Sequence, residues 1–363
     1  MKNSIGTSVI LTVFGESHGP AVGVVLDGLA PGLPVDEAAI AEALSRRRPA
    51  GPADTARVEP DRFQLVSGVY QGRTTGTPLT ILIPNKNVRS EDYSQLERVA
   101  RPSHADYTAQ CKYHGWQDPR GGGHFSGRVT AGIVAAGAIC RQALEAKGIR
   151  LGTHILRCGA VEDAPFTDVA SEIDRIEAKR FPLILDLEEQ VEAAVLAAKE
   201  QQDSLGGVVQ TGICGLPAGL GEPWFDSLEG VLARAAFAIG GVKGIEFGEG
   251  FGLAALRGSQ ANDSFRMEGE RVVTATNRSG GINGGITNGM PVIFNLAVKP
   301  TPSIAQAQQT VDFVEGKDVE LSLKGRHDPA IIRRICPVVT ALTAVVLCDQ
   351  LALRFGTDYL AQL

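Results

Sequence analysis

Short runs of β-branched and other apolar residues, each bounded by turn-forming residues, recur along the chain and predict strands. They lie at 23–26, 80–83, 207–209 and 292–296. Longer segments with apolar residues on one helical face, most of them rich in alanine, predict helices. These segments are 36–47, 127–146, 187–202, 228–238 and 338–355, and Asp36 is placed to cap the first of them. Strands, glycine-rich loops and helices are therefore expected to alternate along the chain.

No segment is long or biased enough to act as a linker between domains. The stretch 162–202 is the most charged and the poorest in glycine, which predicts a peripheral excursion. One internal echo joins distant parts of the chain: Gly-Val-Val-Leu-Asp-Gly-Leu-Ala-Pro-Gly-Leu-Pro at 23–34 resembles Gly-Val-Val-Gln-Thr-Gly-Ile-Cys-Gly-Leu-Pro at 207–217. A duplicated half explains this echo, and so does the chance recurrence of glycine turns.

Composition narrows the class of protein. Apolar residues make up 44% of the 363 residues, enough for a large core and too many for a disordered chain. The net charge of −6 argues against a protein that coats nucleic acid or an anionic membrane. Glycine is unusually common, with 43 copies in clusters, which favours tight turns close to a ligand.

The chain shows no secretory signal, and we expect a soluble cytoplasmic protein. The longest largely apolar stretch, 337–347, is shorter than the roughly 20 residues that a membrane-spanning helix needs. The six cysteines form no CxxC pair and are expected to stay reduced.

Four of the six histidines lie in loops rich in glycine or polar residues: His18, His104, His124 and His327. Histidine exchanges protons near neutral pH, so these four are candidates for acid–base chemistry. Each of them alone is as well explained by a turn cap or a buried hydrogen bond. No metal-binding motif is present, and no metal site is predicted.

Basic residues concentrate where an anionic ligand would bind. Arg46, Arg47 and Arg48 follow one another at the end of a predicted helix, and Arg128 and Arg326 lie beside glycine-rich loops. Guanidinium groups suit phosphate and carboxylate, although one of the three adjacent arginines is explained by helix capping.

Backbone N–H groups of glycine loops offer a second way to bind an anion. Such loops lie at 121–127, 240–252 and 280–289, and the segment Lys-Pro-Thr-Pro-Ser at 299–303 adds a cation and two hydroxyls on a stiff backbone. None of them matches the P-loop or a complete dinucleotide-binding fingerprint. Spacing alone therefore predicts a multiply anionic ligand with histidines for proton transfer, without revealing the reaction.

Taken together and in order, eight sequence blocks closely resemble the chorismate synthase family. The blocks are GESHG (15–19), RRRP (46–49), RPSHADYT (101–108), RGGG (120–123), GGVKGIEFG (240–248), SGGINGG (279–285), KPTPS (299–303) and GRHDP (325–329). Each block alone is a weak signal, but eight in the family's order are very specific.

The resemblance implies a fold, a reaction and partners. The family fold is α+β, a single-domain β-α-β sandwich with two pseudo-symmetric halves, here residues 1–363, assembled as a homotetramer. The implied reaction is the anti-1,4-elimination of phosphate from 5-enolpyruvylshikimate 3-phosphate to give chorismate, the last step of the shikimate pathway and of the common route to aromatic amino acids. It makes the protein a lyase and a flavoprotein that requires reduced FMN (FMNH2), although no net oxidation occurs.

The resemblance also assigns roles to residues. His18, with Ser17 beside it, would donate to the departing phosphate, His104 would balance the charge of the reduced flavin, and Asp328 would help take up the substrate proton. The implied substrate-binding arginines are Arg46, Arg47, Arg48, Arg128 and Arg326. The implied FMN contacts are His124, Phe125, Ser126, Gly240, Gly241, Gly284, Lys299, Pro300, Thr301, Pro302, Ser303 and Arg326.

Two loops depart from the family pattern. Many relatives have RGGGRSSAR where this chain has RGGGHFSGR, which changes the contacts expected of His124 and Phe125. The loop after RRRP is Ala-Gly-Pro-Ala-Asp-Thr and lacks the further basic residue usual there. Some relatives reduce their own flavin with NADPH, whereas the length of this chain favours an external flavin reductant.

Two alternatives stay open at this stage. A flavin-dependent oxidoreductase acting on a small phosphorylated acid would oxidise one flavin in each turnover. A non-catalytic anion-binding protein would bind the same ligands without turnover.

Overall fold

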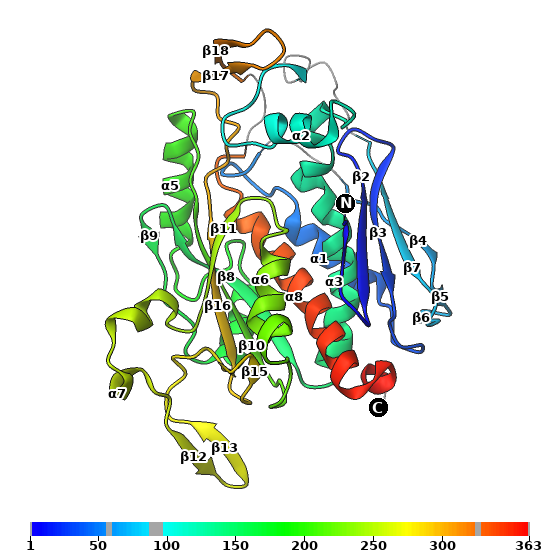
Figure 1. Ribbon diagram of the computed structural model, residues 1–363, viewed down its shortest axis with the longest axis vertical. Coiled ribbons are helices and arrows are strands. Elements are labelled where there is room, and N and C mark those ends of the chain that lie inside the picture. The colour runs from blue at the N-terminus through cyan, green and yellow to red at the C-terminus, as the bar shows by residue number, and fades with distance from the viewer. Residues whose placement is uncertain (1, 56–59, 87–96, 324–327, 362–363) are drawn as a thin grey trace.

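Two antiparallel sheets enclose a layer of helices (Figure 1). The computed structural model describes residues 2–55, 60–86, 97–323 and 328–361. The first sheet has the order β1-β2-β3-β7-β4, with bounds Ser4–Ile5, Ile10–Gly15, Ala21–Asp27, Leu79–Pro84 and Gln64–Ser67. The second has the order β11-β16-β10-β8-β9, with bounds Val242–Phe247, Val292–Val298, Gly207–Cys214, Arg150–Cys158 and Val161–Glu162.

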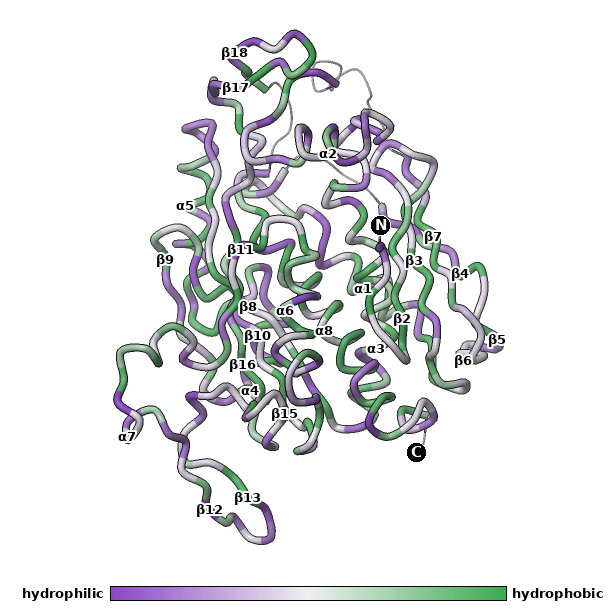
Figure 2. Tube along the Cα trace, viewed as in Figure 1, coloured by the Kyte–Doolittle hydropathy of each residue, from purple (hydrophilic) through white to green (hydrophobic). Residues whose placement is uncertain are grey.

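Helices fill the space between the sheets. α3 (Thr130–Glu145) packs on β3 and β7, and α8 (Ile332–Phe355) packs on β8 and β10. α1 (Glu37–Arg47) and α6 (Leu228–Ala236) pack beside them, and apolar residues concentrate in this middle layer and on the strands that face it (Figure 2). The arrangement confirms the α+β fold with two sheets around a helical layer.

The remaining elements lie around this sandwich. α4 (Val169–Glu177) packs against β8 and β10, and α5 (Glu188–Glu200) packs beside β9, so the charged stretch 162–202 is peripheral as predicted. Short helices α2 and α7 span Asp106–Tyr113 and Gly258–Ala261. Small hairpins pair β5 (Val69–Tyr70) with β6 (Arg73–Thr74), β12 (Phe265–Glu268) with β13 (Arg271–Thr274), β14 (Ile282–Asn283) with β15 (Ile286–Thr287), and β17 (Gln308–Asp312) with β18 (Lys317–Leu321).

The echoed Gly-Val-Val segments occupy matching places. Residues 23–25 lie in β3 and residues 207–209 begin β10, and each of these strands is the middle strand of its five-stranded sheet. The match supports two pseudo-symmetric halves.

Most of the predicted elements are present, but α8 begins earlier than predicted. The Asp36 carboxylate accepts hydrogen bonds from the N–H groups of Ala38 and Ala39, which confirms the predicted cap of α1. α8 starts at Ile332 rather than at 338, with Pro337 inside it. A proline removes one helical hydrogen bond, but burial of Ile332, Ile335 and Cys336 holds the first turns against the core.

α8 is also the helix, among the residues that the structure describes, that is long and apolar enough to cross a membrane. Its most apolar window is 94% buried inside the protein, so it serves as a core helix.

The close approach of α3 and α8 depends on small side chains. A Cβ added to Gly137 of α3 would overlap the backbone and Cβ of Ala341 in α8. We therefore expect Gly137→Val to lower the free energy of unfolding by about 1–3 kcal/mol, because the helices must separate to admit the side chain. The measurement is the urea midpoint at unchanged slope. Gly258→Val is the control, since a Cβ at Gly258 meets nothing within 4 Å; equal midpoints would contradict this packing.

Candidate functional site

A cavity of about 840 Å³ lies at one end of the helix layer. Its wall combines segments that are far apart in sequence: the N-terminal strands, the segments around residues 103–105 and 124–130, the end of α6, residues 299–303 and the first turns of α8. Part of the wall is apolar, with Leu11, Val13, Ile133, Ile335 and Val338. A mostly apolar wall with a few polar groups that can orient a ligand is typical of a cofactor or substrate site.

The structure brings many of the predicted site residues to this cavity. Those that line it are Arg47, His104, His124, Phe125, Ser126, Gly240, Gly241, Lys299, Pro300, Thr301, Pro302 and Ser303. They come from five separate segments of the sequence, four of which belong to the blocks RRRP, RPSHADYT, GGVKGIEFG and KPTPS.

The altered RGGGHFSGR loop is anchored at His124. The His124 Nδ1–H donates a hydrogen bond of 2.8 Å to the carbonyl oxygen of Gly15 at the end of β2, because a carbonyl only accepts. This bond leaves Nε2 as the nitrogen that can meet a ligand. Phe125 is 44% exposed and packs edge-on against Tyr113, so the loop offers an apolar face to the cavity.

The triple glycine lies directly against two histidines. A Cβ on Gly121 would overlap Cε1 and Nδ1 of His18, and a Cβ on Gly122 would lie 3.3 Å from Cε1 of His104. Ser17 donates its N–H to the Gly123 carbonyl at 3.0 Å. The glycines therefore allow the loop to bring His18 and His104 close to one short stretch of backbone.

Ser17 and His18 are buried next to this loop and outside the lining of the large cavity. The Ser17 Oγ is buried and has no hydrogen-bond partner among the described residues. A buried hydroxyl without a partner is costly and is typical of a site that awaits a ligand or water.

His104 belongs to an ionic cluster with Arg101 and Asp106. Arg101 makes a two-pronged contact with the Asp106 carboxylate, at 2.8 and 2.7 Å, and His104 Nδ1 lies 3.0 Å from Asp106 Oδ1. Burial opposes ionisation of Asp106, but hydrogen bonds from Arg101 and His104 outweigh it and hold the pKa of Asp106 well below its usual range. The carboxylate is therefore charged at any physiological pH.

The three adjacent arginines, Arg46, Arg47 and Arg48, lie in three different environments. Arg47 lines the cavity, donating to the Thr130 hydroxyl at 2.9 Å and to the Gly127 carbonyl at 2.6 Å. Arg46 points elsewhere: it pairs with Glu42 on the exposed side of α1 and lines a second cavity of about 560 Å³. Arg48 caps the end of α1 and is half-buried outside the lining of the large cavity.

Arg128 is buried and forms an ion pair with Asp61, which also pairs with Arg47 at 3.5 Å. One buried carboxylate thus lies between two of the predicted substrate-binding arginines. Breaking such a pair leaves an uncompensated buried charge, so Asp61 fixes the positions of both guanidinium groups.

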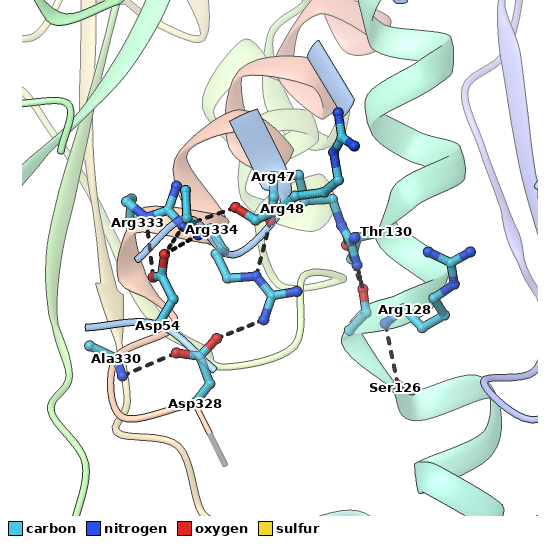
Figure 3. A network of polar contacts seen from close by, with 12 residues as sticks. Arg47, Arg48, Asp54, Ser126, Arg128, Thr130, Asp328, Ala330, Arg333 and Arg334 are labelled. Carbon is cyan, nitrogen blue, oxygen red and sulfur yellow. Dashed lines mark hydrogen bonds and ion pairs between the residues drawn. The ribbon is translucent and has the colours of Figure 1, made fainter. Parts of the chain in front are cut away.

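Two further arginines join the start of α8 to the end of α1 (Figure 3). Arg333 donates to the carbonyls of Arg46 and Arg48 and pairs with Asp54, and Arg334 donates to the Arg47 carbonyl at 3.0 Å. Arg334 also lies 2.7 Å from the carboxylate of Asp328, which is buried. The carbonyls that end α1 and the charges that begin α8 therefore hold each other in place.

The segment 299–303 offers polar groups to the cavity. Lys299 donates to the carbonyl of Ser103, next to His104. Burial, and secondly the nearby Lys243 cation, lowers the pKa of Lys299. The Thr301 Oγ1 is buried without a hydrogen-bond partner among the described residues, although it lines the cavity.

Two predicted residues lie apart from this group. Gly284 is in the turn between β14 and β15 and is not among the described residues that line the cavity. Arg326 lies outside the described residues, as does His327 of the same GRHDP block. The structure describes no cluster of three or more His, Cys, Asp or Glu side chains suited to a metal ion within its ranges.

Sequence reasoning missed several polar residues of the site: Arg101, Asp106, Arg234 and Arg334. Arg101 and Asp106 stand in the same block as His104, so their place in that block was a signal that could have found them. Arg234 lies inside a helix with nothing in the sequence to single it out, and Arg334 depends on the earlier start of α8.

Comparisons with known proteins agree along nearly the whole chain. The chorismate synthase family model matches residues 9–352. Among curated relatives, chorismate synthase of Aeropyrum pernix is 47% identical over 97% of this chain and 93% of its own length, and that of Pyrococcus abyssi is 46% identical over 96% and 97%. A crystal structure of chorismate synthase superposes with a TM-score of 0.77 at 27% identity, covering 98% of this chain and 95% of that chain.

Proposed function

The chain belongs to the chorismate synthase family, and we propose that the cavity of about 840 Å³ is its active site. The protein is a carbon–oxygen lyase that removes phosphate from 5-enolpyruvylshikimate 3-phosphate by anti-1,4-elimination, forming chorismate in the last step of the shikimate pathway. The observation that carries the placement is that four separate family blocks line this one cavity.

The family needs a reduced flavin, and the cavity residues fit FMN. The Thr301 hydroxyl is buried without a partner, and a Cβ on Gly240 would meet nothing within 4 Å, so both positions leave room for a polar ligand. We assign the flavin contacts to His124, Phe125, Ser126, Gly240, Gly241, Lys299, Pro300, Thr301, Pro302 and Ser303. Gly284 and Arg326 remain candidates on the family resemblance alone.

The chemistry that a reduced flavin supplies when bound is a loan of electron density while phosphate departs, recovered as the C–H bond breaks. The protein residues supply charge and protons. His18, with Ser17, donates a hydrogen bond or a proton to the departing phosphate, and the buried hydroxyl of Ser17 is free to add a second donor.

His104 lies in the wall of the cavity, where a donated N–H balances negative charge on the flavin. Asp328 takes part in the uptake of the substrate proton. Its contact with Arg334 is consistent with a carboxylate held in place beside the cavity that Arg334 lines.

Arginines bind the phosphate and the two carboxylates of the substrate. Arg47 is the member of the 46–48 run that lines the cavity, and Arg334 joins it there. Arg46, Arg48, Arg128 and Arg326 are the further candidates, and Arg128 would act from its ion pair with Asp61. Guanidinium groups held by carboxylates keep their geometry when a second anion arrives.

The substrate is a small molecule. We further propose that residues 1–363 form one domain, that the protein is a cytoplasmic homotetramer, and that an external reductant supplies its reduced flavin.

The test of this function is anaerobic. The purified protein is mixed with 5-enolpyruvylshikimate 3-phosphate and chemically reduced FMN, and chorismate, phosphate and the flavin spectrum are followed together. We expect catalytic formation of both products with the flavin still reduced at the end. One flavin oxidised for each product molecule would instead show a net redox reaction, and tight binding of both ligands without product would leave an anion-binding protein.

We expect Asp328→Asn to lower turnover by roughly 10²-fold or more while flavin affinity stays near that of the wild type, since a proton-transfer group typically contributes about that much. The amide keeps the shape of the side chain and an acceptor for Arg334 but removes the charge. Steady-state rates and anaerobic flavin titrations measure the two quantities. Asp318→Asn, on the exposed side of β18, is the control. Lost flavin affinity with the residual chemistry intact would make Asp328 a structural residue.

A further inference from the structure

The cluster around His104 places one anion and one cation against the same ring nitrogen. His104 Nδ1 lies 3.0 Å from Asp106 Oδ1 and 3.0 Å from Arg101 Nη2. Arg101 and Asp106 also contact each other, at 2.7 Å between Nη2 and Oδ1. No hydrogen bond engages the Nε2 of His104 among the described residues, and the side chain is 19% exposed at the cavity.

Asp106 and Arg101 each form a hydrogen bond with Nδ1 in only one of its protonation states. A carboxylate accepts hydrogen bonds, so Asp106 needs a proton on Nδ1. A guanidinium donates, so Arg101 needs Nδ1 without a proton. Because both distances are satisfied together, the ring can gain or lose the Nδ1 proton without rotating.

We propose that Arg101 and Asp106 form a positioning pair that keeps an N–H at His104 Nε2, facing the ligand cavity, in both charge states of the ring. When His104 is charged, Nδ1–H donates to Asp106 and Nε2 carries its own proton. When His104 is neutral, Arg101 donates to Nδ1 and the remaining proton stays on Nε2. A ligand atom that accepts from Nε2 thus meets the same donor in either state.

The fixed surroundings support this arrangement. Asp106 is the first residue of α2, and a second bond, from the Arg101 N–H to Asp106 Oδ2 at 2.9 Å, ties the two ends of the loop. Arg101 also donates to Ser303 Oγ at 3.4 Å, which links the pair to the cavity segment 299–303. Arg101 and Asp106 are the charged groups of its own segment that meet His104. The other charged or titratable groups in the walls of the two cavities that His104 lines are Lys2, Arg47, His124, Arg234, Lys299 and Arg334 in the large one, and Glu97 and Asp118 in the small one.

The proposal deepens the role of His104 in the proposed function, and its test is independent of turnover. Protein labelled with ¹⁵N-histidine is titrated by NMR without flavin or substrate, and the signals of His104 are identified by their loss in His104→Gln. Nitrogen shifts distinguish the Nδ1–H from the Nε2–H neutral form. In the wild type we expect the neutral ring to carry its proton on Nε2.

Substitutions of Arg101 and of Asp106 should have different effects on the proton of the neutral His104 ring. In Arg101→Met the neutral ring loses its donor to Nδ1, and we expect its proton to move to Nδ1, where Asp106 accepts it. In Asp106→Asn the ring keeps Arg101 as the donor to Nδ1, and we expect the neutral ring to keep its proton on Nε2. Arg98→Met, which breaks the neighbouring pairs with Asp312 and Glu315, should leave the His104 spectrum unchanged.

A neutral wild-type ring with its proton on Nδ1 would overturn the proposal, as would an unchanged tautomer in Arg101→Met. Circular dichroism first establishes that each variant is folded. If Arg101→Met does not fold, Asp106→Asn decides alone, and a neutral ring with its proton on Nδ1 in that variant rejects the pair. A protein that passes these tests but forms no chorismate would refute the proposed active site and leave the positioning pair intact.

Discussion

Replacing His18 with glutamine is expected to lower turnover by about 10²–10⁴-fold, the usual contribution of a group that transfers a proton in the rate-limiting step. His18 is 6% exposed and lies against Gly121, so its ring has a fixed position from which it can donate to a departing phosphate. Glutamine fills much of the same volume and keeps a hydrogen-bond donor, but it cannot give up a proton. The loss should therefore fall on kcat, while flavin affinity changes little because His18 lies outside the lining of the large cavity.

Rapid-mixing assays of phosphate release with reduced FMN measure this effect directly. His114→Gln is the matched control, because His114 is an exposed residue that ends α2. His104→Gln should also lower turnover, by 10-fold or more, and should weaken flavin binding as well, because His104 lines the cavity. Unchanged turnover in both variants would remove the two histidines from the mechanism.

The sequence predicted elements where local pattern and tertiary environment agree. β3, β7 and β16 are short apolar runs between turn residues, and they are strands in the structure. β8 was missed because its sequence, Arg-Leu-Gly-Thr-His-Ile-Leu-Arg-Cys, neither alternates nor forms a clean apolar run, yet it is buried between α8 and α4. Its strand conformation comes from pairing with β10 and β9, which no local pattern records.

The same limit applies to the site. Motifs indicated the candidate histidines and glycines, since those residues stand in loops rich in glycine or polar residues. The partners that hold them are long-range: Arg128 meets Asp61 across 67 positions, and Arg333 meets Asp54 across 279. Such pairs cannot be deduced from spacing. Two of the arginines predicted for substrate, Arg47 and Arg128, share the buried carboxylate of Asp61, which fixes both guanidinium groups before a ligand binds.

The triple glycine is visible in the sequence as a motif, but its effect on the site comes from packing. We expect Gly121→Ala to lower turnover by roughly 10²-fold, the scale of loss when a catalytic group moves by about 1 Å. Gly121 has φ +58°, where a side chain is unfavourable, and its Cβ would overlap Cε1 and Nδ1 of His18 and lie 3.0 Å from Ser17 Oγ. The methyl group must therefore displace the imidazole that we propose as the donor to the departing phosphate.

Two other glycines separate the causes of that loss. Gly148→Ala has a similar backbone cost at φ +74°, but a Cβ there meets nothing within 4 Å, so stability should fall slightly and turnover should not. Gly122→Ala brings a methyl group to 3.3 Å from Cε1 of His104, a contact that a small shift relieves, so its effect on turnover should be intermediate. Equal turnover in Gly121→Ala and Gly148→Ala would mean that the loop does not position His18. A loss of turnover that is largest in Gly121→Ala, smaller in Gly122→Ala and absent in Gly148→Ala would show that the triple glycine is required because it leaves room for two histidine side chains.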